Sequence, residues 1–546
     1  MKRFIEKYDG KEFDLVIIGG GITGAAVAYD AASRGLSVAL IEMGDFGSAT
    51  SSATSKLIHG GFRYLANGEI GLVRESLRER RTLENIAPNF VYPIPIMFTT
   101  NRVKLTNYWM VIKIGMIMYD LLSFDRKFTW DRSKRIPSHY SLSAEETLRL
   151  EPNVKKEGLT GSQVYYDCMS IFPERLTLAF IRSAVSYGAE VSNYLKAEGF
   201  IFDSENRVSG VRSRDTLNGS MHEIKGKVII NCAGPWADIV LNMAQSRTGN
   251  HMVRRSEGIH VITKKLVNDH IVGSITPAGR HFFLIPWRGH SLIGTTDKEY
   301  IGTPEDWRVT RKAIQELLDE VNESFGSNGK IMYEDVKYCY GGLRPLVEDQ
   351  TENVYETSRK YEIYDNSKDG LEGLITVEGG KYTTSRQLAQ NVMKMVIKKI
   401  RKKPGKMITR NRHLHGCEIK DMTSFMQEIK KNNTDFPEKT LDYLGRIYGT
   451  EYKQILDLAR QNPALAEPLN DDGEMLAQVV YAARNEMALT LDDIMFRRTG
   501  LGTLGHPGRD ILSLIADCAA EELNWDSERK KKEIAAVEKA LAVPED

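Results

Sequence analysis

A chain of 546 residues is too long to fold around one hydrophobic core, so the sequence must form more than one domain. The 74 lysines and arginines balance the 73 acidic residues, and this net charge of +1 excludes nucleic-acid binding driven by bulk charge. The five cysteines lie far apart, at 168, 232, 339, 417 and 518, which excludes a disulfide framework and a zinc site and favours a reducing compartment.

The amino terminus lacks the apolar core of a secretion signal. The most apolar segment, residues 108–122, is broken by Lys113 and Asp120 and is too short to span a bilayer. We therefore expect a cytoplasmic protein without a transmembrane helix.

The first predicted element is a strand at 13–18 that leads into Gly19, Gly21 and Gly24 and then into an alanine-rich helix. In such a unit Gly19 permits the tight turn, Gly21 leaves room for a pyrophosphate, and Gly24 allows close packing of helix on strand. The helix N-terminus offers N–H groups and partial positive charge to the phosphates. This pattern predicts dinucleotide binding; the alternative is an ordinary strand-to-helix turn.

A second strand, residues 37–41, ends in Glu42. A carboxylate at this position accepts hydrogen bonds from the ribose hydroxyls. Because the same charge would repel a ribose 2′-phosphate, NADP is the least favoured occupant.

Residues 51–64 are too polar and too rich in glycine for core, and are typical of a loop that crosses a bound ligand. A charged helix is predicted over 69–84, and residues 88–170 show no alternation of strands and helices, which indicates a second domain. A buried strand then ends in the small residues that precede a helix, at 228–238.

Strands predicted at 258–263, 282–286 and 291–294 indicate an antiparallel sheet. A last strand, from 374, ends in Gly379 and Gly380 before Lys381 and a helix. Three separate strand ends thus resemble ligand-approaching turns, as in a dinucleotide domain that is interrupted by a substrate domain.

From residue 404 the sequence is mainly helical, with helices predicted at 441–448, 452–460, 475–485, 492–498 and 510–523 and with Thr490 and Asp493 as a capping pair. The predicted fold class is α/β plus α. A Rossmann-like dinucleotide domain (1–85, 160–240 and 340–403) is interrupted by an antiparallel-sheet substrate domain (86–159 and 241–339). A helical domain follows at 404–546.

Several motifs along nearly the whole chain resemble one family. They are the N-terminal glycine turn, residues 51–64, 232–238, Ile293-Gly294-Thr295-Thr296-Asp297, 340–346, 378–386, 485–488 and 497–499. This set is similar to the FAD-dependent glycerol-3-phosphate dehydrogenases, within the D-amino-acid-oxidase-like flavoprotein superfamily. The resemblance implies FAD, sn-glycerol 3-phosphate as donor, dihydroxyacetone phosphate as product and a membrane quinone as acceptor.

The glycine turn and the resemblance together predict the residues that hold FAD. These are Gly19, Gly21, Ile22, Thr23, Gly24, Glu42, Ser51, Ser52, Lys56, His59, Gly60, Gly61, Ala233, Gly234, Trp236, Gly380, Lys381, Tyr382 and Thr383. Some distant relatives attach the flavin covalently to a histidine near the position of His59. We expect non-covalent FAD here.

A phosphate dianion calls for arginine, whose planar guanidinium forms bidentate charged hydrogen bonds. The substrate-binding residues that the resemblance implies are Arg63, Tyr64, Thr296, Asp297, Arg344, Arg359 and Lys381. Lys381, at a strand end after two glycines, would stabilise negative charge on the reduced flavin. Arg344 and Lys381 are therefore also expected to act in catalysis.

The reaction also needs a base that takes the hydroxyl proton. His260, on the predicted strand 258–263, stands where the family carries a histidine and is the favoured candidate. Asp297 is its rival, with the alternative role of fixing the Gly-Thr-Thr turn.

The helix around 383–403 is amphipathic, with Leu388, Val392, Met395, Val396 and Ile400 on one side and a nearly pure basic side opposite. The simpler interpretation is a core-facing helix with a solvated basic face. A basic face also attracts anionic lipid headgroups. We expect peripheral attachment through this helix to the inner face of the cell membrane.

Other functions stay open at this point. An oxygen-using glycerol-3-phosphate oxidase, an amine or amino-acid oxidase of the same fold, or a non-catalytic FAD-binding module would share much of the pattern. The sequence leaves a homodimer open as the assembly and predicts no metal site.

Overall fold

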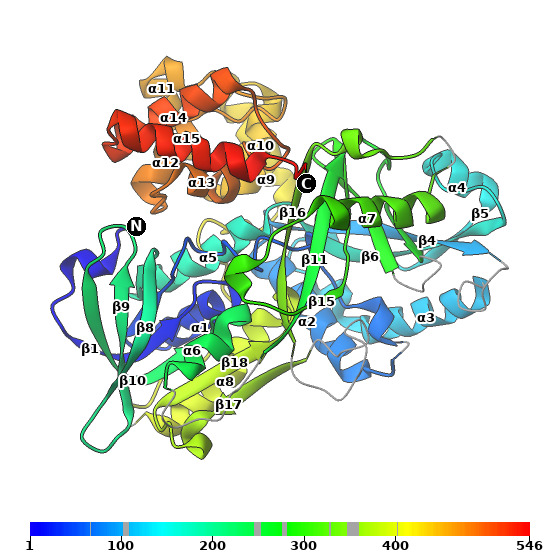
Figure 1. The fold of residues 1–546 in the computed structure, drawn as a ribbon. Helices are drawn as coiled ribbons and strands as arrows, with labels where there is room; N and C mark the ends of the chain where they lie inside the picture. The colour runs from blue at the N-terminus through cyan, green and yellow to red at the C-terminus, as the bar shows by residue number, and fades with distance from the viewer. Residues whose placement is uncertain are drawn as a thin grey trace.

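A computed structural model of the protein describes residues 1–65, 67–101, 109–244, 253–275, 281–326, 329–346, 360–400 and 402–545. Two sheets lie side by side, and the C-terminal helices form a separate layer that crosses one end of them (Figure 1).

The first sheet has eight strands and is centred on β1 (Glu12–Ile18). β1 lies parallel to β2 (Val38–Ile41) and to β10 (Met221–Asn231), and β10 lies parallel to β18 (Leu374–Gly379). The carboxyl ends of these four strands therefore meet at one edge, where ligands bind in open parallel sheets. The other strands of this sheet are β7 (Glu190–Ser192), β8 (Leu195–Phe202), β9 (Val208–Asp215) and β17 (Tyr361–Asp365).

Alternate residues of β1 enter two different cores. Leu15 and Ile17 pack with α1 (Ile22–Ser33), α5 (Pro173–Ser186) and α8 (Ser385–Lys399). Val16 and Ile18 pack on the opposite face, under β8, β9 and α6 (Ala237–Asn242). Both faces of the sheet are thus covered, as its near-continuous apolar run requires.

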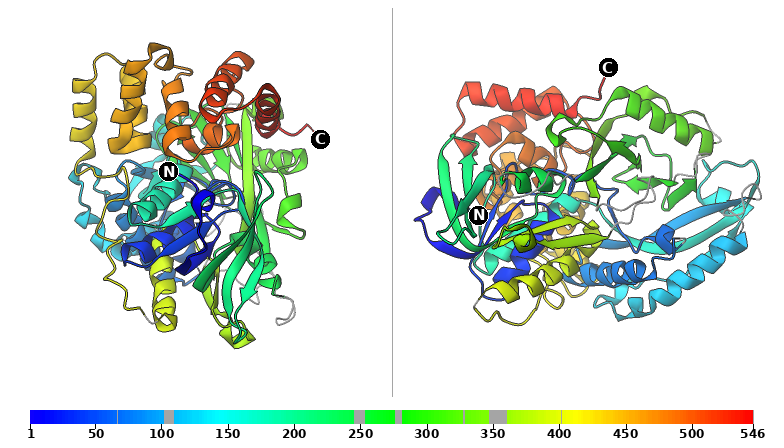
Figure 2. Two further views of the ribbon diagram at one scale, coloured as in Figure 1. Left: turned by 90° about the vertical axis from the view of Figure 1, so that its left-hand side faces the viewer. Right: turned by 60° about the horizontal axis from the view of Figure 1, so that its bottom comes forward.

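The second sheet has ten strands, and its one parallel pair among the described strands is β4 with β12. Helix α7 (Arg311–Ser324) covers one face, and α2 (Ile70–Ile86) and α3 (Trp109–Leu122) lie toward the other (Figures 1 and 2). The strands predicted at 258–263, 282–286 and 291–294 fall within β11, β13 and β14. The ten strands are β3 (Leu57–Ile58), β4 (Val91–Asn101), β5 (Tyr140–Ser143), β6 (Leu159–Ser170), β11 (Arg254–Thr263), β12 (Ile271–Ile275), β13 (His281–Trp287), β14 (His290–Gly294), β15 (Lys298–Tyr300) and β16 (Tyr338–Leu346).

Two segments pair differently from the predicted division of the chain. β6 pairs with β4, and β16 pairs with β11 along nine residues, so both belong to the second sheet. The sequence placed residues 160–170 and 340–346 with the dinucleotide domain. The composition of a segment can show that it forms a strand, but which strand it pairs with depends on residues far away in the sequence.

Helix α8 turns its apolar face inward. Leu388, Val392, Val396 and Ile400 are buried in the core beneath the first sheet, with α1 as the neighbouring helix. Lys399 pairs with Asp365 and Glu372, so part of the basic side is neutralised within the protein. The apolar face of α8 therefore packs on the core, as the simpler interpretation of its sequence predicted, and has no access to lipid.

The C-terminal helices form their own core and share another with the second sheet. Each predicted helix is present, with 492–498 divided between α13 and a π-helical turn at Ile494–Arg498. Thr490 and Asp493 form the expected capping box. Two further helices, α9 and α15, were not predicted. The helices are α9 (Met422–Asn432), α10 (Glu438–Tyr448), α11 (Tyr452–Gln461), α12 (Leu476–Asn485), α13 (Leu491–Asp493), α14 (Arg509–Leu523) and α15 (Ser527–Leu541); α4 (Ala144–Leu150) lies in the second domain.

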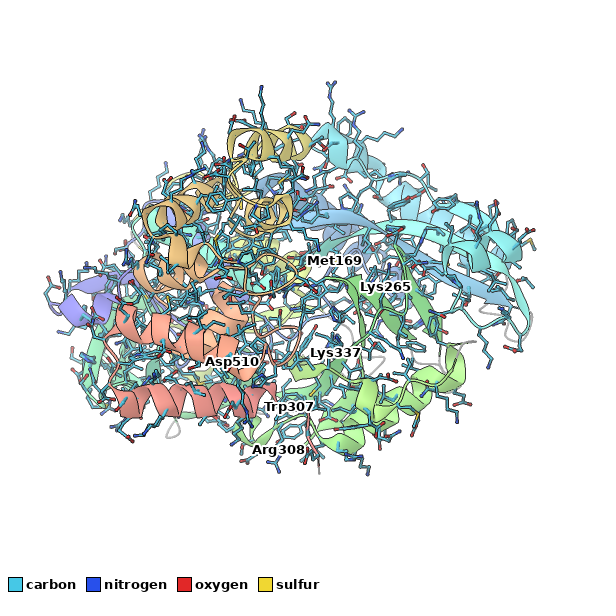
Figure 3. The ribbon with its side chains drawn as sticks, turned by 90° about the horizontal axis from the view of Figure 1, so that it is seen from above. Met169, Lys265, Trp307, Arg308, Lys337 and Asp510 are labelled. Carbon is cyan, nitrogen blue, oxygen red and sulfur yellow. The ribbon has the colours of Figure 1, made fainter. Side chains whose placement is uncertain are left out.

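Buried ion pairs attach this layer to the rest of the molecule. Asp45, just beyond β2, accepts hydrogen bonds from Arg497 at 2.7 Å and from Arg498 at 2.7 and 2.8 Å. Seen from above, Asp510 of α14 and Lys337, which precedes β16, lie at the border between the helices and the second sheet (Figure 3).

Candidate functional site

A cavity of about 830 Å³ lies at the carboxyl edge of the first sheet and extends to the second. The loops that follow β1, β2, β10 and β18 line it, together with β16. The lining residues that the sequence predicted are Gly19, Gly21, Ile22, Thr23, Glu42, Ser51, His59, Tyr64, Ala233, Gly234, Trp236, Arg344, Gly380, Lys381, Tyr382 and Thr383. One cavity thus brings together most of the predicted cofactor residues and three of the predicted substrate residues.

The glycine turn has the close contacts that its sequence implies. Gly19 has a φ of +106°, and a Cβ there would lie 2.5 Å from the carbonyl oxygen of Cys232. A Cβ on Gly24 would overlap with the carbonyl oxygen of Gly19. The N-terminus of α1 therefore lies tightly against the strand end, and Gly21, Ile22 and Thr23 face the cavity.

Glu42 is held by the backbone on both sides. Its Oε2 accepts a hydrogen bond from Gly20 N–H at 2.6 Å, and Oε1 accepts one from Gly44 N–H at 2.8 Å. Burial raises the pKa of this carboxyl group. Each oxygen retains a second lone pair for a hydroxyl group in the cavity.

A cationic cluster surrounds Tyr64 at another part of the cavity. The Lys381 ammonium lies 4.2 Å from the centre of the Tyr64 ring and donates to Ser76 Oγ at 3.2 Å. The Arg63 guanidinium lies 5.0 Å from the same ring, although Arg63 does not line the cavity. Burial lowers the pKa of Lys381.

Arg344, on β16, reaches across β11 over Gly258, whose missing side chain leaves room for the guanidinium. It donates to Thr295 Oγ1 at 2.7 Å and to the Thr296 carbonyl at 3.2 Å, and lies 3.5 Å from Asp297 Oδ1. The side chain is thus fixed at the cavity wall.

His260 lies behind the wall rather than in it. Its Nε2 is 2.8 Å from Ser55 Oγ, and Ser55 lines the cavity. The imidazole stacks on Tyr340 with ring centres 4.9 Å apart, and Nδ1 has no hydrogen-bond partner among the described residues. Burial, followed by the charges of Arg344 and Lys56, lowers the pKa of His260 well below its usual value, so the ring is neutral at pH 7.

Thr296 and Asp297 support this wall and do not line the cavity. Thr296 Oγ1 accepts a hydrogen bond from Ile259 N–H at 3.0 Å, and Asp297 accepts one from Ser256 Oγ. The alternative that the sequence left open for Asp297, a role in fixing the turn, matches these contacts.

Four other predicted cofactor residues do not line the cavity. Lys56 is buried and pairs with Glu174 at 2.7 Å, so its ammonium points away from the cavity. Ser52 hydrogen-bonds to backbone carbonyls of its own loop. Gly60 donates its N–H to Asp167, and Gly61 lies against Tyr64 and Lys381. Arg359 falls outside the described residues.

Further lining residues were missed. Residues 43, 44 and 47–50 connect Glu42 to Ser51, and their glycine- and serine-rich composition could have identified them. Pro304, Glu305 and Trp307 approach from a connection after β15, and nothing in their sequence marks them as cavity residues. The indole of Trp307 is fixed by a 2.9 Å hydrogen bond to Glu257.

This donor set fits an extended dinucleotide with a flavin. The cavity is lined by the open N-terminus of α1, which suits the phosphates, and by a carboxylate that can accept hydrogen bonds from the ribose hydroxyls. It is also lined by a buried cation, which suits an electron-accepting ring.

Comparison with known proteins agrees with this geometry. Residues 14–386 match the family of FAD-dependent oxidoreductases. A glycerol-3-phosphate dehydrogenase from Synechocystis sp. is 33% identical over 96% of this chain and 95% of its own length. The chain belongs to the FAD-dependent glycerol-3-phosphate dehydrogenase family.

Other similarities extend over the whole chain. Residues 407–530 match the C-terminal domain of alpha-glycerophosphate oxidase. An aerobic glycerol-3-phosphate dehydrogenase from Staphylococcus epidermidis is 31% identical over 97% of this chain and 94% of its own. The structure of the glycerol-3-phosphate dehydrogenase from Bacillus halodurans complexed with FAD is 28% identical, with a TM-score of 0.77 over 97% of this chain and 95% of that one. The family thus has both the α/β cofactor fold and the helical domain.

In the ranges that the structure describes, no helix is both long and apolar enough to cross a membrane.

Proposed function

We propose that this protein oxidises sn-glycerol 3-phosphate to dihydroxyacetone phosphate and passes the electrons to a membrane quinone. The observation that carries the proposal is that Arg344, Lys381 and Tyr64 line the same cavity as the dinucleotide turn. A substrate anion held by these groups lies in the space that also holds the cofactor. Family membership and the named relatives support the same substrate.

When bound, FAD accepts the hydride equivalent from C2 of the substrate. The residues proposed to hold it are the glycine turn, Glu42, Ser51 and the 380–383 loop. The binding is proposed to be non-covalent. His59 lines the cavity, and burial, Lys381 and Arg63 together lower its pKa to about 3. Colour that stays with acid-precipitated protein would contradict non-covalent binding.

Charge complementarity assigns the phosphate to the cations. Arg344 offers a planar guanidinium held by Thr295 and Thr296, and Lys381 offers an ammonium beside Tyr64. Two fixed positive charges in a partly buried site offset much of the cost of taking a dianion out of water. Arg63 and Arg359 are proposed as additional contributors to phosphate binding.

The proton of the C2 hydroxyl is proposed to leave through Ser55 to His260. The serine hydroxyl faces the cavity, and its oxygen lies 2.8 Å from Nε2 of a neutral ring that is able to accept a proton. Asp297 is paired with Arg344 and Ser256 and is less suited to this task.

Stopped-flow reduction of the purified, FAD-loaded protein by glycerol 3-phosphate without oxygen tests the function. Bleaching of the flavin absorbance is expected, with Arg344→Ala retaining FAD but requiring far more substrate and Arg344→Lys intermediate. Absence of bleaching at any substrate concentration would contradict the proposed donor.

The acceptor is tested separately. Turnover with a soluble quinone analogue is expected to exceed peroxide formation in air by a wide margin. A peroxide yield of one per substrate at a similar rate would instead identify an oxygen-using oxidase. The proposed location is the cytoplasmic face of the membrane that contains the quinone.

A further inference from the structure

The outer face of α3 carries an unusual concentration of exposed apolar side chains. Half of the twenty exposed large hydrophobic residues in the described chain fall between 109 and 130: Trp109, Met110, Val111, Ile114, Ile117, Met118, Leu121, Phe124, Phe128 and Trp130. Met110 is 68% exposed and Leu121 is 69% exposed. Contiguous apolar surface of this kind marks an interaction site.

These side chains form one continuous stripe. Met110, Ile114, Ile117 and Leu121 recur at spacings of three and four residues, which places them on one face of the helix. Two more exposed aromatic residues, Phe124 and Phe128, extend the stripe into the short 3-10 helix Phe124–Phe128.

The opposite face anchors the helix to the protein. Ile112, Met116 and Tyr119 are buried, and Tyr119 OH donates to Asp167 at 2.6 Å. Asp167 in turn pairs with buried Arg80. The exposed stripe is therefore held on a fixed support.

The charged residues around the stripe indicate which kind of partner binds it. The exposed charged residues of segment 109–135 are all basic: Lys127, Arg132 and Arg135. None of its three acids is exposed: Asp120 pairs with Arg126, Asp125 pairs with Arg74, and Asp131 accepts hydrogen bonds from the Ser133 and Met422 N–H groups. An apolar face with a basic rim is complementary to an anionic bilayer surface.

We propose that this stripe, residues 109–130, is a bilayer-binding surface that seats the protein on an anionic membrane. Fourteen residues of helix extend about 21 Å, short of the roughly 30 Å of bilayer hydrocarbon, so α3 lies in the interface plane and does not span. Trp109 and Trp130, toward the two ends, suit the headgroup level.

A second copy of the chain fits this surface less well. In a symmetric dimer the two apolar stripes would pack on each other, but segment 109–135 of neither subunit would offer an exposed acid to the basic rim of the other. Helices α3 and α8 both lie on the side of the molecule away from the C-terminal helices (Figures 1 and 2). Helix α8 also carries the exposed basic residues Lys394 and Lys398.

The surface also adjoins the cavity. Phe62 packs against Tyr119 of α3 with ring centres 5.7 Å apart, and Tyr64 in the same short helix lines the cavity. Delivery of electrons from this cavity to a lipid-borne quinone rests on the proposed function, whereas the bilayer contact rests on α3 alone.

Cosedimentation of the FAD-loaded protein with phosphatidylglycerol-containing vesicles tests the proposal. Wild type is expected in the pellet, with less bound at high salt. Ile114→Gln/Ile117→Gln/Leu121→Gln should lower the partition coefficient by more than about tenfold. The control variant Leu217→Gln/Met221→Gln/Ile301→Gln removes exposed apolar residues elsewhere and should bind as wild type.

Substrate reduction of the flavin and dye-linked activity should be the same in all three proteins, which separates this test from that of the proposed function. Wild type that stays in the supernatant, or an α3 variant that binds as well as wild type, would overturn the proposal. Light scattering that shows a dimer in wild type and a monomer in the α3 variant, without vesicle binding, would assign the stripe to a contact between copies.

Discussion

The contact between Ser55 and His260 connects the cavity to a buried imidazole. Burial keeps the ring neutral, and its stacking on Tyr340 fixes its plane. A neutral imidazole 2.8 Å from a hydroxyl is placed to receive a proton, while its distance behind the wall gives it no role in holding the phosphate.

Ser55→Ala is therefore expected to lower kcat by roughly a hundredfold or more, with little change in KM. His260→Asn should lower it similarly, and the double variant should be no worse than either. Steady-state kinetics with a dye acceptor measures the effect.

Ser52→Ala is the matched control, because Ser52 is in the same loop but hydrogen-bonds only to the backbone of that loop among the described contacts. A full loss of activity in Ser52→Ala, or additive losses in the double variant, would contradict the relay.

At the scale of elements, α1 is held against β1 by the absence of a side chain at Gly24. A methyl group there overlaps with the backbone carbonyl of Gly19, which has no rotamer with which to move away. The position of the helix N-terminus at the cavity depends on this contact.

We expect Gly24→Ala to destabilise the fold by at least about 1–3 kcal/mol and to lower the FAD content of the purified protein. Urea unfolding and the ratio of flavin to protein absorbance measure the two effects. Gly71→Ala is the control, since an added Cβ in the first turn of α2 meets nothing within 4 Å and should be neutral or slightly stabilising. An unchanged FAD content in Gly24→Ala would contradict the packing role.

The sequence predicted those elements whose signals are local. The strand, turn, helix and second strand up to Glu42 follow from composition and spacing, and the resemblance brought Arg344 and Lys381 to the same ligand. The pairing of β16 with β11 and of Lys56 with Glu174 joins residues far apart in the chain, so no window of sequence could reveal it.

Burial was the harder property to predict for helices. Both α3 and α8 are amphipathic, and their sequences alone do not indicate which face of each helix packs against the core. The basic side of α8 drew attention to lipid, yet its apolar face lies inside. The broadly apolar α3, considered only as a failed membrane span, leaves its apolar face outside.

At the scale of the molecule, Asp45 joins the cofactor domain to the helical layer. Burial acts to raise the pKa of Asp45, but the charges of Arg498 and Arg497 hold this pKa below its usual range. The carboxylate is ionised, and loss of its charge leaves the buried Arg498 guanidinium without its carboxylate partner, while Arg497 keeps its ion pairs with Asp492 and Asp493.

Asp45→Asn should lower the free energy of unfolding by about 3–5 kcal/mol. The exposed pair of Arg484 with Glu522 provides the comparison, since Arg484→Gln should cost no more than about 1 kcal/mol. Urea denaturation followed by circular dichroism checks both, and equal effects of the two variants would show that Asp45 does not act as a clamp.

Acid sensitivity is also a property of the whole molecule. His59 and His260 have lowered pKa values when folded, whereas an unfolded histidine titrates near 6.5. As pH falls below 6.5 the unfolded chain binds protons that the folded protein does not, so the free energy of unfolding decreases from pH 7 toward 4. The slope is up to about 1.4 kcal/mol per pH unit for each histidine.

His59→Asn should reduce this slope, measured by urea denaturation at each pH with constant excess FAD. His506→Asn, at an exposed site, is the control for loss of an imidazole. A slope in His59→Asn equal to that of wild type would contradict the assignment.

The arginines that neutralise Asp45 follow it by 452 and 453 positions. At translation rates of ~5–20 residues per second, roughly 20–90 seconds separate the synthesis of the acid from that of its counterions. During that interval the nascent chain carries this carboxylate without its two arginine counterions. The cofactor-binding domain therefore reaches its full stability only in the finished chain, after release from the ribosome.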